Sequence, residues 1–121
     1  MIFKCSERMQ DEWWKLEPRL WQIIVDVEIW CRERGICPVW TCFLRTEAEQ
    51  DALVSSGASK YPNSVHEYGR GADLREFEPE ARRIELQTFI NSKYAYGDGL
   101  HQTMIWHEGT ALHGHIQVRQ L

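Results

Sequence analysis

Hydrophobic residues recur at three- and four-residue intervals in the first third of the chain, which predicts one apolar stripe along an α-helix. We expect this helix to begin near Pro18, because proline suits the first helical position, and to end at Gly35. It should form much of the core. The stripe consists of Leu16, Leu20, Ile23, Ile24, Val27, Trp30 and Cys31.

Two further segments carry helical signals. A short helix is expected from Thr46, whose hydroxyl can cap it, to about Val54. A longer helix is expected from Pro79 to Ser92, before the break at Gly97-Asp98-Gly99. Its apolar side is predicted to comprise Ile84, Leu86, Phe89 and Ile90.

Alternation of polar and apolar residues predicts strands elsewhere. In Gly71–Leu74, Asp73 lies on one face and its two neighbours lie on the other. His113–Arg119 alternates in the same way and is expected to form a hairpin with Gln102–Trp106, through the turn Glu108-Gly109-Thr110. With a strand at Pro38–Leu44, the pattern predicts an α+β fold in which a small antiparallel sheet packs with helices.

Length and composition limit the other possibilities. The 121 residues suit a single domain over positions 1–121, and 43% hydrophobic residues with six tryptophans are enough for a core. No apolar run approaches the length of a membrane span. A formal net charge of −4 gives no support to a nucleic-acid partner.

Cysteine and tryptophan positions give weaker information. The four cysteines, Cys5, Cys31, Cys37 and Cys42, contain no Cys-x-x-Cys pair. We expect them to be small apolar core residues. Trp13 and Trp14 are also expected in the core, with a ligand surface as the alternative.

Histidine and aspartate residues are spaced as in a metal site. His66 precedes Asp73 by seven residues, and Gly69 and Gly71 between them allow a tight turn and a close backbone approach. His113 and His115 point to one face of their strand, because side chains alternate. Two imidazoles and a carboxylate suit one zinc ion, and three protein ligands leave a tetrahedral ion one open position.

These residues carry a family resemblance. The pattern Ser64-x-His66-x-x-Gly69-x-Gly71-x-Asp73, followed by His113-x-His115, resembles the zinc peptidases of the D-Ala-D-Ala carboxypeptidase group. Their fold is shared with lysostaphin-type peptidases and the Hedgehog signalling domain. The segment Thr41–Gln50 is similar to the family segment in which an arginine ends a strand. Alanine is common in the family at the position of Gly71, an exchange that we expect to be conservative.

The resemblance implies both the site and the substrate. One zinc ion per chain would be bound by His66, Asp73 and His115, while Arg45 would hold a substrate carboxylate or the oxyanion. Gln50 and Ser64 are further candidates for substrate contacts, although Ser64 is also placed to shape the turn before His66. The implied substrate is the peptidoglycan stem peptide, cut at L-Ala-D-Glu by an endopeptidase or at D-Ala-D-Ala by a carboxypeptidase.

The catalytic base stays open at this point. Many family members have an acidic residue three positions before the last zinc histidine, where this chain has Leu112. Two candidates remain, His113 and Glu108. His113 fits better on spacing alone, whereas Glu108 requires the turn at Gly109 to bring it inward.

Two other functions remain possible alongside the zinc peptidase. One is a catalytically inactive, zinc-stabilised binding or virion-structural domain, which Leu112 favours. The other is a structural domain without metal. The first eight residues lack the apolar stretch of a secretory signal, so we expect cytoplasmic synthesis. Action on the cell wall would then need release of the kind found in bacteriophage lysis.

Overall fold

The computed structural model describes residues 3–60, 64–108 and 111–121. Its helices are α1 (Glu7–Glu12), α2 (Pro18–Glu33), α3 (Glu47–Ser55) and α4 (Glu80–Lys93), with the 3₁₀ turns η1 (Trp13–Lys15) and η2 (Val65–Tyr68). Its strands are β1 (Trp40–Cys42), β2 (Gly71–Arg75), β3 (Met104–His107) and β4 (His113–Gln117). The predicted α+β class is confirmed. No helix in the described part of the chain has the length and apolar character to cross a membrane.

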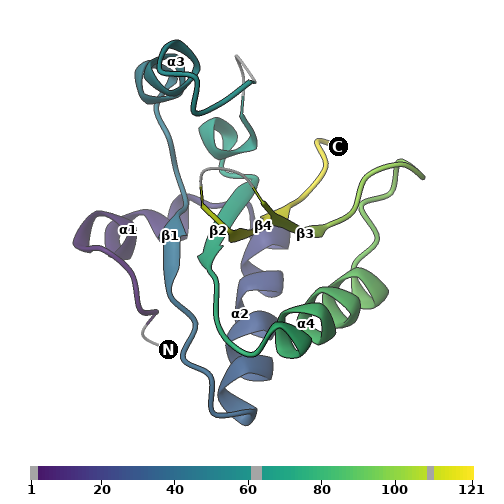
Figure 1. The fold of residues 1–121 in the computed structure, drawn as a ribbon. Helices are drawn as coiled ribbons and strands as arrows, with labels where there is room; N and C mark the ends of the chain where they lie inside the picture. Colours follow the sequence, from purple (N-terminus) through teal and green to yellow (C-terminus); the bar gives the residue numbers. More distant parts are fainter. Residues whose placement is uncertain (1–2, 61–63, 109–110) are drawn as a thin grey trace.

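The four strands form an antiparallel sheet in the order β1-β2-β4-β3, so the two strands that carry predicted metal ligands are neighbours (Figure 1). Asp73 on β2 lies opposite His115 on β4. The predicted pairing of β3 with β4 is confirmed. Within their connection, Gly109 and Thr110 lie outside the described residues.

One face of this sheet belongs to the core. Ala72 and Leu74 of β2 are fully buried, as are Met104 of β3 and Ile116 of β4. Helix α2 contacts β2, α4 contacts β3, and the two helices contact each other. Because strand side chains alternate, Asp73 and His115 are directed to the opposite face.

Helix α2 follows its sequence pattern closely. It begins at Pro18, and the stripe predicted from Leu16 to Cys31 is buried. Beyond its end at Glu33, Gly35 adopts a φ of 73° and donates to the Arg32 carbonyl at 3.1 Å, while the Ile36 amide donates to the Cys31 carbonyl at 2.9 Å. These two bonds satisfy carbonyls at the helix end in a Schellman motif.

Helix α4 uses a different face from the predicted one. Leu86 and Ile90 are buried as expected, but Ile84 is 55% exposed and Phe89 is 36% exposed. The third buried position is Arg83, whose guanidinium donates to the Phe77 carbonyl at 2.8 Å. Ile84 and Phe89 are each one residue away from this buried line, which turns them about 100° from it.

Two predictions of core packing are wrong in part. Cys31 is buried, but Cys37 is exposed and Cys42 is only partly buried. Trp13 and Trp14 are 38% and 63% exposed, because the turn η1 runs along the surface.

The prediction for α3 is confirmed, since the Thr46 hydroxyl accepts from the Glu49 amide in a capping box.

Candidate metal centre

Asp73 is the centre of a buried polar cluster. Its Oδ1 atom lies 2.8 Å from Nδ1 of His115 and 3.2 Å from Nε2 of His66. The edge of a tetrahedral zinc shell with nitrogen or oxygen ligands measures about 3.3 Å, given bonds of about 2.0 Å. The two distances to Asp73 are therefore each close to that edge, but His115 lies outside the group of described ligand atoms that are all within 4.8 Å of one another.

His66 is oriented as a metal ligand by its other ring nitrogen. Nδ1 lies 3.1 Å from the Phe43 carbonyl oxygen, an acceptor that requires Nδ1 to donate. Nε2, which faces Asp73, is then the nitrogen with a lone pair to offer a cation. The turn η2 is supported by the Ser64 hydroxyl, which accepts from the His66 amide at 3.2 Å. Ser64 therefore has the turn-shaping role that its position suggested.

The backbone around η2 is tightly packed. Gly69 has a φ of 68°, and a Cβ atom there would lie 3.1 Å from the Lys15 carbonyl oxygen. At Gly71 a Cβ atom would lie only 2.5 Å from Cγ2 of Val65. The expectation that alanine is a conservative replacement for Gly71 is therefore wrong for this chain, because Val65 fills the space that the methyl group needs.

Electrostatics in the cluster favour a bound cation. Burial alone would lower the pKa of His66, but hydrogen bonds with Asp73 and Cys42 raise this pKa to about 10. Burial would likewise raise the pKa of Asp73, yet the neighbouring His115 and His66 hold it below its ordinary range. The ionised Asp73 thus pairs with imidazole rings, and a divalent cation binds such a site in exchange for protons.

Cys42 joins the cluster, and the sequence reasoning missed it. The potential ligand atoms of Cys42, His66 and Asp73 all lie within 4.8 Å of one another. His115 contacts Asp73 but is not part of that most compact group. A mixture of sulfur, nitrogen and carboxylate oxygen suits zinc, which accepts all three ligand types. The residues present therefore fit the implied metal.

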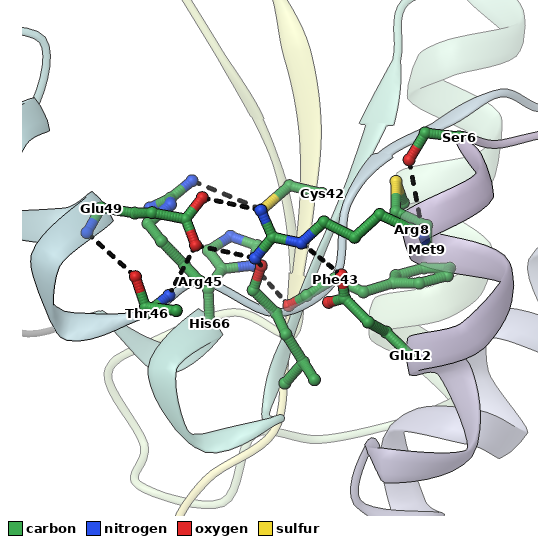
Figure 2. Close-up of polar contacts among 11 residues, drawn as sticks. Ser6, Arg8, Met9, Glu12, Cys42, Phe43, Arg45, Thr46, Glu49 and His66 are labelled. Atoms are coloured by element: carbon green, nitrogen blue, oxygen red, sulfur yellow. Dashed lines mark hydrogen bonds and ion pairs between the residues drawn. The ribbon is translucent and has the colours of Figure 1, made fainter.

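Arg45 stands beside this cluster and is held in place. Its Nη1 donates to Oε1 of Gln50 at 2.7 Å, and its Nη2 lies 3.5 Å from Sγ of Cys42 (Figure 2). Gln50 is 1% exposed and donates in turn to the Ser59 hydroxyl at 3.0 Å. Gln50 is thus placed to orient Arg45. Because the Gln50 side chain is buried, a substrate could not contact it directly.

A cavity of about 170 Å³ adjoins the cluster on the side of α1. Cys42 and Arg45 line it together with Arg8 and Glu49. Arg8 makes two bonds to the Glu49 carboxylate, at 2.7 and 2.8 Å, across the gap between α1 and α3 (Figure 2). The Arg45 guanidinium is therefore available to a group that enters this cavity.

The two candidate bases lie in different surroundings. His113 is the first residue of β4, and its side chain lies on the same strand face as that of His115. Its Nδ1 atom is 3.0 Å from the Ala111 carbonyl oxygen. Glu108 is exposed beyond the end of β3, with no hydrogen bond or ion pair to any other described residue. The geometry favours His113, which shares the strand face of the predicted ligand.

His107 is a third imidazole beside the predicted site, and it was not among the predicted site residues. It pairs with His113 across β3 and β4, and its ring centroid lies 5.3 Å from that of His113 and 5.5 Å from that of His115. Burial, with the charges of His115 and His113, lowers the pKa of His107. The position of His107 opposite the His113-x-His115 segment was the sequence signal that could have identified this residue. His101, by contrast, is an exposed histidine paired with Asp98.

Comparison of this chain with family models, with curated proteins and with solved structures finds no match in any of the three. The geometry of the cluster therefore carries the functional argument.

Proposed function

We propose that this chain is a zinc-dependent peptidase that hydrolyses peptide bonds of the peptidoglycan stem peptide. The observation that carries the proposal is the convergence of His66 and His115 on one oxygen of Asp73. These three residues would hold the metal. When bound, zinc supplies Lewis-acid chemistry, because it polarises a carbonyl group and makes water a stronger nucleophile.

Arg45 is placed to bind the substrate. The adjoining cavity gives it access to a carboxylate, and stem peptides carry carboxylates both on side chains and at the chain end. The fixed charge and forked donors of a guanidinium suit that group. Because Gln50 already holds one arm of Arg45, little conformational freedom is lost when substrate binds.

His113 is the proposed general base. It would take a proton from the attacking water and return one to the leaving amine. This task requires a group within direct or one-water reach of the reacting atoms, and His113 lies two residues from His115 on the same strand face. Glu108 is the alternative base, and its exposed position requires a movement that His113 does not need.

A second function is favoured by two observations, the presence of Leu112 where the family commonly has an acid and the presence of Cys42 in the cluster. A cation enclosed by four side chains has a structural role more often than a catalytic one. The second candidate is thus a zinc-stabilised binding or virion-structural domain without activity.

Incubation with purified peptidoglycan fragments separates the two functions. The zinc-loaded chain is expected to release new amine termini, which mass spectrometry would locate at one bond of the stem peptide. His66→Ala, which removes a ligand, should release none, and His101→Ala serves as a matched control because it removes an exposed histidine. A folded, zinc-loaded chain that cuts no fragment would support the structural role and exclude the peptidase.

A further inference from the structure

Cys42 occupies its position because of an irregularity in β1. Trp40 pairs with Leu74 of β2, but Cys42 pairs with Asp73, so two steps along β1 correspond to one step along β2. In a regular antiparallel ladder Cys42 would lie opposite Ala72, on the core face. The bulge at Thr41 instead turns the thiol to the face of Asp73, and bulges are frequent where a side chain must be re-aimed beside a functional site.

The thiol then lies among metal-ligand atoms. Its sulfur is within 4.8 Å of the ligand atoms of His66 and Asp73. The other three cysteines are placed differently. Cys31 is buried in the apolar core, Cys37 is exposed, and the Cys5 thiol faces the Phe3 carbonyl oxygen at 3.7 Å.

A cationic side chain, that of Arg45, also lies beside the Cys42 thiol. Nη2 of Arg45 lies 3.5 Å from Sγ of Cys42 (Figure 2), and both residues line the adjoining cavity. Cys42 thus lines the cavity, whereas His66 and Asp73 are not among its lining residues.

We infer that Cys42 is a fourth protein ligand of the cation, which completes a Cys-His-Asp-His shell in the substrate-free protein. The inference rests on the proposed zinc site and adds to it. A group that reaches the metal from the cavity would have to displace the Cys42 sulfur, since Cys42 is the member of the cluster that lines the cavity. The substrate-free enzyme would then hold its metal tightly, with no side open to solvent.

Cobalt binding tests this inference and separates it from the proposed function. Co²⁺ added to the metal-free chain under a non-thiol reductant gives visible bands in a four-coordinate site, and a thiolate ligand adds a near-ultraviolet charge-transfer band. We expect both features in the natural chain. Cys42→Ser should keep the visible bands, lose the charge-transfer band and weaken zinc binding by at least about tenfold. Cys37→Ser, which removes an exposed thiol, should change neither.

The possible outcomes are distinct. Visible bands without a charge-transfer band in the natural chain would overturn the role of Cys42 and leave the proposed metal site intact. A charge-transfer band that survives in Cys42→Ser would also overturn it. Failure to bind Co²⁺ at all would overturn both proposals.

A second measurement needs no substitution, in case Cys42→Ser does not fold. Alkylation of the natural chain, mapped by mass spectrometry, should become at least about tenfold slower at Cys42 when zinc is added, because a metal-bound thiolate is protected. Alkylation of the exposed Cys37 should keep its rate. Equal rates at Cys42 with and without zinc would contradict the inference.

Discussion

Asp73 and His115 face each other across β2 and β4, with 2.8 Å between Oδ1 of the aspartate and Nδ1 of the histidine. The two strands are adjacent at the middle of the sheet, and their core-facing neighbours Ala72, Leu74 and Ile116 are fully buried. The positions of both side chains are therefore fixed by the packing of the sheet. A site built on such strands is held more accurately than one built on loops.

Replacement of His113 tests the proposed base. His113→Ala should leave zinc affinity unchanged, because the residue is not one of the proposed ligands, and should lower kcat on peptidoglycan fragments by about 10²- to 10⁴-fold. Steady-state kinetics and zinc titration on the same preparation would check both expectations. Undiminished turnover would remove His113 from the mechanism and leave Glu108 as the candidate, for which Glu108→Gln is the matching variant.

Replacement of Gly71 tests the packing around η2. Gly71→Ala should lower the free energy of unfolding by about 1–3 kcal/mol, because the new methyl group overlaps Val65. In the background of Val65→Ala, the same replacement should cost much less. Urea denaturation of the four proteins in this cycle measures the coupling. A Gly71→Ala protein as stable as the natural chain would show that Val65 moves without cost.

Acid should weaken the link between α1 and α3. Hydrogen bonds from Arg8, with those at Thr46, lower the pKa of Glu49 to about 2 from its ordinary value of 4.5. A carboxyl group with a lowered pKa in the folded state stabilises the protein above its unfolded pKa, and this contribution is lost as pH falls toward 2. The effect should be small, because both side chains are partly exposed.

Glu49→Gln isolates this contribution. Glutamine can still complete the capping box with Thr46 but cannot pair with Arg8 as an anion. The variant should be less stable than the natural chain at pH 7, and the two should converge near pH 2 in thermal unfolding. Glu47→Gln, in the same turn of α3, should leave the pH dependence unchanged. Parallel pH profiles for Glu49→Gln and the natural chain would contradict the assignment.

Paired substitutions on α4 test which face it buries. Leu86→Ala should cost about 2–5 kcal/mol of unfolding free energy, as expected for a fully buried leucine. Ile84→Ala should change stability by no more than about 0.5 kcal/mol, because that side chain is 55% exposed. Denaturant unfolding measures both, and similar losses at the two positions would contradict the observed face.

Long, regular patterns were the predictable part of this fold. The stripe of α2 spans four turns and indicates its buried face, while Pro18 and Gly35 mark its ends. Thr46 likewise marks the start of α3. Alternation predicted the face of its own strand for each of Asp73 and His115, and the pairing of β2 with β4 brings the two faces together. Helix α4 was harder, because a buried arginine takes a core position that a hydrophobic pattern assigns to Ile84.

The candidate site was predictable except where local irregularity decides a direction. Cys42 has the period of a core residue, together with Trp40, and only the bulge at Thr41 turns it toward Asp73. Such a bulge depends on how β1 pairs with β2, and strand pairing is not visible in one strand's sequence. The place of His107 beside the site likewise depends on its pairing with His113 across the hairpin.

Zinc titration of the metal-free chain by isothermal calorimetry tests the central claim most directly. We predict one zinc ion per chain, an affinity at least about tenfold weaker in Asp73→Asn, and an unchanged affinity in His101→Ala. Circular dichroism would establish that each variant is folded. The account would be contradicted if the natural chain bound no zinc, or if folded Asp73→Asn bound it as tightly as the natural chain does.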